Sequence, residues 1–221
     1  MVHGAQLTQV RLCQGRGEEV IATLEQAVAA NARTPAWRAG LAAGYCWLGR
    51  HAEAAAIVEE AASDGFDDIP WDHVRMVALA LYSEAASQTG NADAAALLYE
   101  LLEPWAGQVI WNGATGYGLS RTYLGLLAAT LGWNSRADEH FAIACEFHET
   151  KDMPLCAARS HLGWAENLVL RGEHQRARGE ARRTLELSRK HGYAVIEPRA
   201  NAIVQSHSSA GTDPQVPGAR D

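Results

Sequence analysis

The sequence predicts an all-α protein, built as an α–α superhelix of about five helical hairpins and a closing helix. A glycine ends an apolar stretch five times, at spacings of 34, 41, 42 and 40 residues: Gly15, Gly49, Gly90, Gly132 and Gly172. A small or apolar residue stands five positions after each glycine: Val20, Ala54, Ala95, Ala137 and Ala177. Apolar residues between these points recur at helical spacing. This pattern is typical of stacked repeats, in which each unit buries its apolar face only against its neighbours.

The third and fourth predicted helices form the clearest unit. Thr34 can cap a helix and Pro35 can occupy its first turn, while Trp37, Leu41 and Tyr45 form an apolar stripe. The next helix follows after a short turn, so the two are expected to pack antiparallel. The helices are expected, in chain order, at 4–14, 17–31, 35–48, 51–63, 72–89, 92–103, 117–131, 134–150, 154–171, 174–191 and 194–205.

Two connections depart from the simple turn. Residues 64–70 form an acidic turn, and residues 104–116 are too long and too rich in glycine for a tight hairpin connection. Trp105 and Trp111 favour packing of the second segment against the core.

One continuous helical domain is therefore expected over residues 1–205. Polar and small residues predict a disordered tail over 206–221.

The repeat unit resembles the tetratricopeptide repeat. The matching residues are Leu41-Ala42-x-x-Tyr45, Gly49 and Ala54-x-x-x-Val58 in one copy, and Leu124-Gly125-x-x-Ala128, Gly132 and Ala137-x-x-x-Phe141 in another. Glycine inside a helix costs about 1 kcal/mol relative to alanine, so Gly125 is expected at a close contact between helices.

Two longer strings carry a closer resemblance. Residues 97–106 and 123–132, followed by 137–141, resemble the C-terminal helical region of actinobacterial multidomain regulators. Those regulators carry a signalling-type (AAA-type) ATPase module with a class III nucleotide cyclase domain or a LuxR-type DNA-binding domain. This chain has no Gly-x4-Gly-Lys-Ser/Thr phosphate loop, and neither the cyclase nor the ATPase. The resemblance implies a regulatory or scaffold module, with a protein or peptide partner; a missing cyclase or ATPase half is one candidate.

Composition excludes several other partners. A net charge of −7 and a pI near 5.7 argue against nucleic-acid binding. The arginines between 171 and 189 alternate with glutamates, as on an ion-paired helix face. No apolar run reaches the roughly 18 to 20 residues that span a bilayer, and the start lacks a secretory signal. We therefore expect a cytoplasmic protein without membrane contact.

No catalytic centre, cofactor or metal site is expected. His140 and His148 stand eight residues apart on one predicted helix, too far to share an ion without other ligands. Gly118-Leu-Ser120 lacks the second glycine of a nucleophile elbow. The four cysteines have no paired spacing and are expected to be buried rather than bridged or bound to zinc: Cys13, Cys46, Cys145 and Cys156.

The candidate site is the concave groove that the first helix of each pair would line. Two occupants remain open. A peptide or helix could dock by apolar anchors and be fixed by Glu84, Arg159 and Glu166, or a small-molecule effector could stack on Trp47 and Tyr117. Alternatively, tight curvature buries these side chains against each other. The predicted residues are Trp47, Glu84, Gln88, Tyr117, Thr122, Arg159 and Glu166.

Self-association is a further expectation. Few large apolar residues precede Gly15, so Ile21, Leu24 and Val28 are expected to lack a covering layer. Uncapped arrays tend to pair end to end, which predicts a homodimer through the N-terminal hairpin.

Overall fold

The computed structural model describes residues 2–31 and 35–206, and this part of the chain is mostly helical, as predicted. Met1, the expected cap Thr34 and residues 207–221 of the expected tail lie outside the described residues. The elements are α1 (Val2–Cys13), α2 (Gly17–Ala30), α3 (Pro35–Trp47), α4 (His51–Ala62), α5 (Arg75–Thr89), α6 (Ala92–Leu102), the short 3-10 helix η1 (Glu103–Trp105), β1 (Val109–Trp111), β2 (Gly116–Leu119), α7 (Ser120–Thr130), α8 (Asn134–Thr150), α9 (Pro154–Leu170), α10 (His174–His191) and α11 (Glu197–Gln205).

Five of the turns between helices share one backbone geometry. Each of the five repeat glycines has a left-handed φ of 67° to 76°. In each turn the glycine N–H donates to the carbonyl three residues back, and the next N–H donates to the carbonyl five residues back, as in Gly15 to Leu12 and Arg16 to Arg11. This is the Schellman motif, in which glycine is favoured because it has no Cβ. The following helix begins two residues after the glycine every time.

The residue five positions after each glycine is fully buried. Val20 is 1% exposed, and its alanine counterparts Ala54, Ala95, Ala137 and Ala177 are 0% exposed. Small side chains at these points let the helix axes approach closely. The recurrence seen in the sequence therefore corresponds to one repeated helix–turn–helix geometry.

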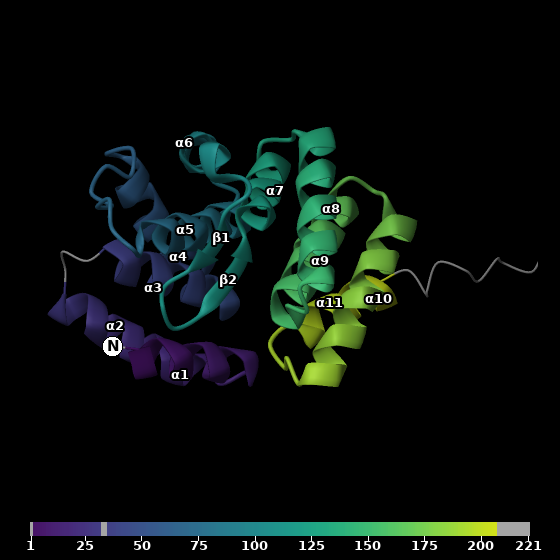
Figure 1. Cartoon of the computed structure of the whole chain (residues 1–221), viewed down its shortest axis with the longest axis horizontal. Helices are drawn as coiled ribbons and strands as arrows, with labels where there is room; N and C mark the ends of the chain where they lie inside the picture. Colours follow the sequence, from purple (N-terminus) through teal and green to yellow (C-terminus); the bar gives the residue numbers. More distant parts are fainter. Residues whose placement is uncertain (1, 32–34, 207–221) are drawn as a thin grey trace, which may run out of the picture.

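The first helices of successive pairs contact one another along the chain. α3 contacts α5, α5 contacts α7, and α7 contacts α9, while α11 packs on α9 and α10. Figure 1 shows the N-terminal helices and the C-terminal helices on opposite sides, with α7 and the β1–β2 hairpin between them. The end of α1 nevertheless reaches the segment before α11, because a Cβ placed on Gly15 would lie 3.7 Å from the Ala194 Cβ.

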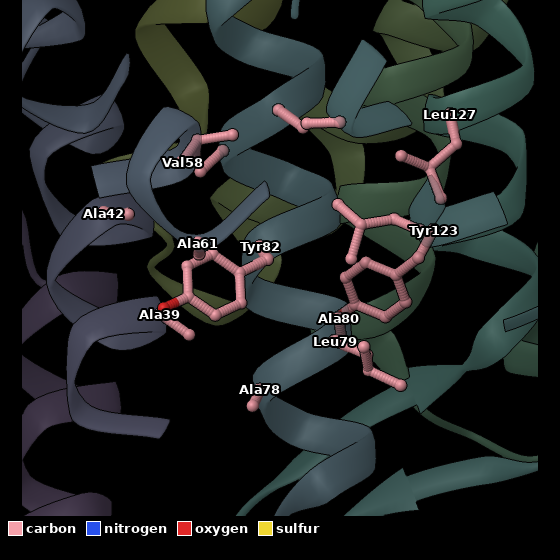
Figure 2. Packing of buried hydrophobic residues seen from close by; sticks show 14 of the residues in the cluster. Ala39, Ala42, Val58, Ala61, Ala78, Leu79, Ala80, Tyr82, Tyr123 and Leu127 are labelled. Atoms are coloured by element: carbon pink, nitrogen blue, oxygen red, sulfur yellow. The ribbon is translucent and has the colours of Figure 1, made fainter. Parts of the chain in front are cut away.

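The core is built largely from alanine and a few large rings. Figure 2 shows the ring of Tyr82 among alanines of neighbouring helices, including Ala39, Ala42 and Ala61. Tyr82 also packs against Phe66, with ring centroids 5.2 Å apart. Large rings thus fill the space that the alanines leave between closely spaced helices.

Gly125 lies at a close contact, as the sequence predicted. A Cβ placed on Gly125 would be 3.0 Å from the ring of Phe141, and one on Gly163 would be 2.9 Å from Leu126. Phe141 is fully buried and stacks on Trp164 at 6.3 Å. The two glycines therefore make room for the Phe141 ring between α7, α8 and α9.

The segment expected as a loop and the start of a helix is instead a β-hairpin. β1 and β2 pair antiparallel, with Ile110 opposite Gly118, so α7 begins at Ser120 rather than at 117. The expectation that Trp105 and Trp111 pack on the core is wrong, since they are 42% and 63% exposed. Ile110 is the fully buried residue here.

The hairpin is held by local hydrogen bonds. The Asn112 Oδ1 accepts from the backbone N–H groups of Ala114 and Thr115, and both the N–H and the hydroxyl of Ser120 donate to the Gln108 carbonyl. An asparagine that caps its own turn is a frequent way to close a tight connection.

The helix α5 begins at Arg75 rather than at 72. The preceding turn is fixed by Phe66 and Ile69, whose side chains are buried at 0% and 2% exposure. Phe66 adopts a left-handed φ of 61°. The Asp72 side chain accepts the N–H of Val74 at 2.9 Å, and its backbone carbonyl accepts the N–H of Arg75 at 3.3 Å, so residues 72–75 form a further turn before the helix.

The N-terminal hairpin is better covered than predicted. Ile21 and Leu24 are buried, and they face α3 where Gly44 and Gly40 leave space. The expectation that these two side chains lack a covering layer is therefore wrong. A homodimer through this hairpin remains a prediction, but uncovered Ile21 and Leu24 side chains no longer support it.

Three of the four cysteines, Cys46, Cys145 and Cys156, are buried, as expected, and Cys13 is half-buried. All four are free thiols. Burial raises the pKa of Cys46 to about 12.

Among the described helices, none is both long and apolar enough to cross a bilayer.

A candidate groove and cavity on either side of Trp47

Six of the seven predicted site residues line one groove of about 320 Å³. We call it the groove; it runs across α3, α5, α7 and α9 and is bordered by α11. Its apolar floor includes Leu126 and Leu162. The predicted residues in it are Trp47, Glu84, Gln88, Thr122, Arg159 and Glu166.

Glu84 and Arg159 bind each other across the groove. The Arg159 Nη2 donates to the Glu84 Oε2, and the two side chains are 16% and 7% exposed respectively. Burial alone would lower the pKa of Arg159, but the Glu84 carboxylate and neighbouring groups raise it above its ordinary value. The pair is therefore a largely buried ion pair joining α5 to α9, and neither side chain is free to form an ion pair with a charged partner.

Glu166 is matched by an arginine that the sequence analysis missed. The Nε and Nη2 of Arg199, on α11, donate to the two Glu166 oxygens at 2.9 and 2.8 Å. Burial raises the pKa of Glu166, and Arg199 opposes that rise. A carboxylate in a mostly apolar lining needs a cationic partner, and this requirement is the signal that pointed to an arginine near Glu166.

Trp47 stands between these two ion pairs. Its ring centroid lies 5.3 Å from the Arg159 guanidinium carbon and 5.4 Å from that of Arg199, both within cation–π range. Trp47 and Arg159 line the groove on one side and a second space on the other. These two side chains therefore form a wall between two hollows.

The second space, which we call the cavity, measures about 620 Å³. Its lining comes from α1, α2, α3, α5, residues 72–74, the β1–β2 hairpin, the start of α9 and residues 195–196. The rings of Trp37, Trp47 and Tyr117 contribute to it. Its most deeply buried residues are Leu24, Ala43, Gly44, Val77 and Ile196.

Tyr117 belongs to the cavity and not to the groove. It lies on β2, and its carbonyl accepts a hydrogen bond of 2.9 Å from the Tyr123 hydroxyl, which ties the hairpin to α7. The sequence predicts Tyr117 at the start of a helix, with Trp47 stacking on the same ligand. The structure keeps both residues around one space, but brings them together from α3 and a strand.

The polar lining residues of the cavity differ in exposure. Asn31, Asp72 and His73 are exposed, whereas Thr8, Gln9, Asn112 and Arg159 are half-buried. The Gln6 side chain on α1 donates to the Ala114 carbonyl in the hairpin at 3.3 Å, which links two walls. The cavity thus combines an apolar interior with one half-buried cationic donor.

Thr122 belongs to a chain of buried hydrogen bonds beneath the groove. Its hydroxyl lies 2.8 Å from the Ser160 hydroxyl, which lies 3.2 Å from the Nδ1 of His148. The His148 Nε2 accepts the N–H of Leu119 at 2.8 Å, so Nδ1 carries the proton of the neutral ring. Burial lowers the pKa of His148 to about 4. This network ties α7, α8 and α9 to β2.

Other histidines also have structural partners. His140 lies 2.9 Å from the Tyr99 hydroxyl, and buried His161 contacts Glu149 and Glu180 at 3.0 and 2.6 Å. Within the described part of the chain, no three side chains of metal-ligating type gather in a way that could hold an ion.

Comparison with protein-family models, with curated proteins and with solved structures gave no match to this chain.

Proposed function

We propose that this chain is a non-catalytic regulatory module of the tetratricopeptide-like superhelix type, and that it responds to a small, largely apolar ligand held in the cavity. Two observations support the superhelix: the five identical turns, and the contacts of α3, α5, α7 and α9 in succession. Kinship with the C-terminal region of actinobacterial regulators stays a prediction carried by the residues quoted above.

The cavity is the observation that carries the proposal. Its volume of about 620 Å³ lies within the range of about 300 to 1,000 Å³ that small-molecule sites occupy. It is lined by aromatic and aliphatic side chains with few polar groups, as such sites are. The smaller groove holds charges that are already paired, so it offers a peptide fewer free charged anchors.

The non-catalytic part of the proposal is supported by the state of the buried titratable groups. Arg159 is paired with Glu84, and both nitrogens of His148 have structural partners. A general acid or base must reach its substrate, directly or through one water. These groups instead hold helices together.

The test uses a neutral fluorescent probe, N-phenyl-1-naphthylamine, which brightens in apolar surroundings. We expect saturable binding to the intact chain. The variant Gly40→Leu should abolish it, because Gly40 lines the cavity and has room for a side chain, its nearest neighbour being Leu24 at 3.7 Å from an added Cβ.

Gly179→Leu is the matched control, since Gly179 lies in the middle of α10 with open space around it. It should bind the probe like the parent chain. Equal binding by the parent and Gly40→Leu would place the probe elsewhere and contradict the proposal.

A second candidate function is binding of a protein or peptide partner in the groove. Leu170, at its end, is 87% exposed, and the Asn167 Nδ2 is buried without a hydrogen-bond partner among the described residues. Selection from a displayed peptide library tests it. Peptides that lose binding to Leu170→Ser but not to Gly40→Leu would support this second function, and failure to select any would count against it.

A further inference from the structure

We propose that the ligand of the cavity is an uncharged molecule with an apolar body and one hydrogen-bond acceptor, such as a ketone, ester or amide carbonyl, and that Arg159 donates to this acceptor. This inference rests on the proposed function and narrows the class of ligand.

The apolar body follows from the lining. The most buried large side chains of the lining, Leu24, Val77 and Ile196, carry no polar atom. The polar residues Asn31, Asp72 and His73 are exposed at the rim, where a ligand group can keep its water. A ligand that fills the interior is therefore predominantly apolar.

The acceptor follows from the unused donors of Arg159. A guanidinium carries five N–H donors, and the hydrogen bond from Nη2 to Glu84 is the one that Arg159 makes to the described residues. The same side chain lines the cavity as well as the groove. The side chain is 16% exposed, so N–H groups of Arg159 that make no hydrogen bond within the chain can donate to an acceptor that a ligand brings into the cavity.

The absence of ligand charge follows from the charge balance of the wall. Two arginines, Arg159 and Arg199, flank Trp47, and each is already neutralised by a glutamate, Glu84 and Glu166 respectively. A ligand carboxylate beside Arg159 would be a third negative charge facing only two positive charges. The Glu84 carboxylate would repel it, and it would also lose part of its hydration. A neutral carbonyl receives the same hydrogen bond without that repulsion.

Three probes with the same number of carbon atoms test the acceptor and the absence of charge separately. They are valerophenone, a neutral ketone; pentylbenzene, its hydrocarbon counterpart; and 4-butylbenzoate, an anion. Each displaces N-phenyl-1-naphthylamine from the intact chain at pH 7.5, and the displacement gives its dissociation constant. We expect valerophenone to bind at least tenfold more tightly than each of the other two.

The double variant Glu84→Gln/Arg159→Met removes both charges of the ion pair together, so no buried charge is left alone. It should bind valerophenone no more tightly than pentylbenzene, because the ketone carbonyl would be buried without its donor. Arg159→Lys, which keeps the charge opposite Glu84 but lacks the planar donor set, is the second variant, and it should lose most of the preference. Thermal unfolding of each variant confirms that it is folded before binding is measured.

Glu166→Gln/Arg199→Met is the matched control, because this pair flanks Trp47 but lies outside the cavity. It should keep the tenfold preference.

A dissociation constant for 4-butylbenzoate equal to or below that for valerophenone would overturn the ligand class and leave the proposed function standing. A preference that persists in Glu84→Gln/Arg159→Met would overturn the role of Arg159. Failure of the fluorescent probe itself to bind would instead refute the proposed function.

Discussion

Arg199 and Glu166 form a two-point ion pair that fastens the last helix to α9. The two N–H···O hydrogen bonds are 2.9 and 2.8 Å long and leave from Nε and Nη2 of one guanidinium. The same guanidinium lies over the ring of Trp47. One side chain of α11 therefore contacts both α9 and α3. These two helices are far apart in the sequence, because α9 begins 107 positions after the end of α3.

Replacing Arg199 by alanine should weaken the attachment of α11. The change leaves Glu166 without its partner at a site where burial raises the pKa of that carboxyl. We expect the free energy of unfolding to fall by about 1 to 2 kcal/mol, the lower part of the scale for hydrogen bonds to charged groups, because the side chains of Arg199 and Glu166 are 31% and 35% exposed. Urea titration followed by circular dichroism measures the change.

Arg189→Ala provides the comparison. Arg189 also pairs with a glutamate, Glu197, but the side chains are 60% and 35% exposed, and exposed pairs contribute about 0 to 1 kcal/mol. Equal losses in the two variants would show that apolar contacts alone hold α11.

Alanine at Gly125 and at Gly179 should change stability in opposite directions. Both glycines lie inside helices, where alanine is favoured by about 1 kcal/mol. At Gly179 nothing lies within 4 Å of an added Cβ, so Gly179→Ala should raise the free energy of unfolding by up to that amount. At Gly125 the new methyl meets the immobile ring of Phe141 at 3.0 Å, so Gly125→Ala should lower it by about 1 kcal/mol or more. Thermal unfolding of both variants measures the difference; a gain at both positions would contradict the packing argument.

Most helices and the turns between them were predictable because their signals are local. The repeat glycines mark turns in which φ is positive, and the small residues after them mark helix contacts, so both can be read within one hairpin. The β-hairpin was missed although it carries a local signal. Val109-Ile110-Trp111 followed by Asn112-Gly113 has the apolar run and the Asn-Gly turn of a hairpin. This signal spans only five residues between two long helical patterns, which favour a helix on either side of it.

The site was predictable only where helical periodicity decides it. Stepping along the first helices placed Glu84, Thr122 and Glu166 on one groove, because one helix face determines these positions. The cavity depends instead on how α1 and the hairpin pack against α3 and the start of α9. Such contacts join residues more than 100 positions apart, as Gln6 and Ala114 do, and no local spacing encodes them.

Gly118→Ala should cost much more stability than Gly113→Ala. The two glycines have nearly the same left-handed φ, 87° and 86°, so the backbone strain of an alanine is similar at both, about 1 kcal/mol or more. Only at Gly118 would the new Cβ collide, 2.7 Å from the Nε2 of His148 and 3.0 Å from the Cβ of Cys156. We expect an additional loss of about 2 kcal/mol for Gly118→Ala, measured by urea titration. Similar losses in both variants would mean that His148 can move aside.

Stability should decrease as the pH is lowered from about 6.5 towards 4. In the unfolded chain His148 binds a proton near its ordinary pKa of 6.5, whereas burial lowers the pKa in the folded chain to about 4. Between these two pKa values the unfolded state binds more protons than the folded state. The free energy of unfolding therefore falls as the pH is lowered, by up to about 3 kcal/mol in total. Burial also lowers the pKa of His140, which acts in the same direction. In His148→Gln the amide oxygen can still accept the Leu119 N–H, but no proton binds. Urea titrations at pH 7 and pH 4.5 should therefore show a smaller loss in this variant, and an equal loss would exclude His148 as the source.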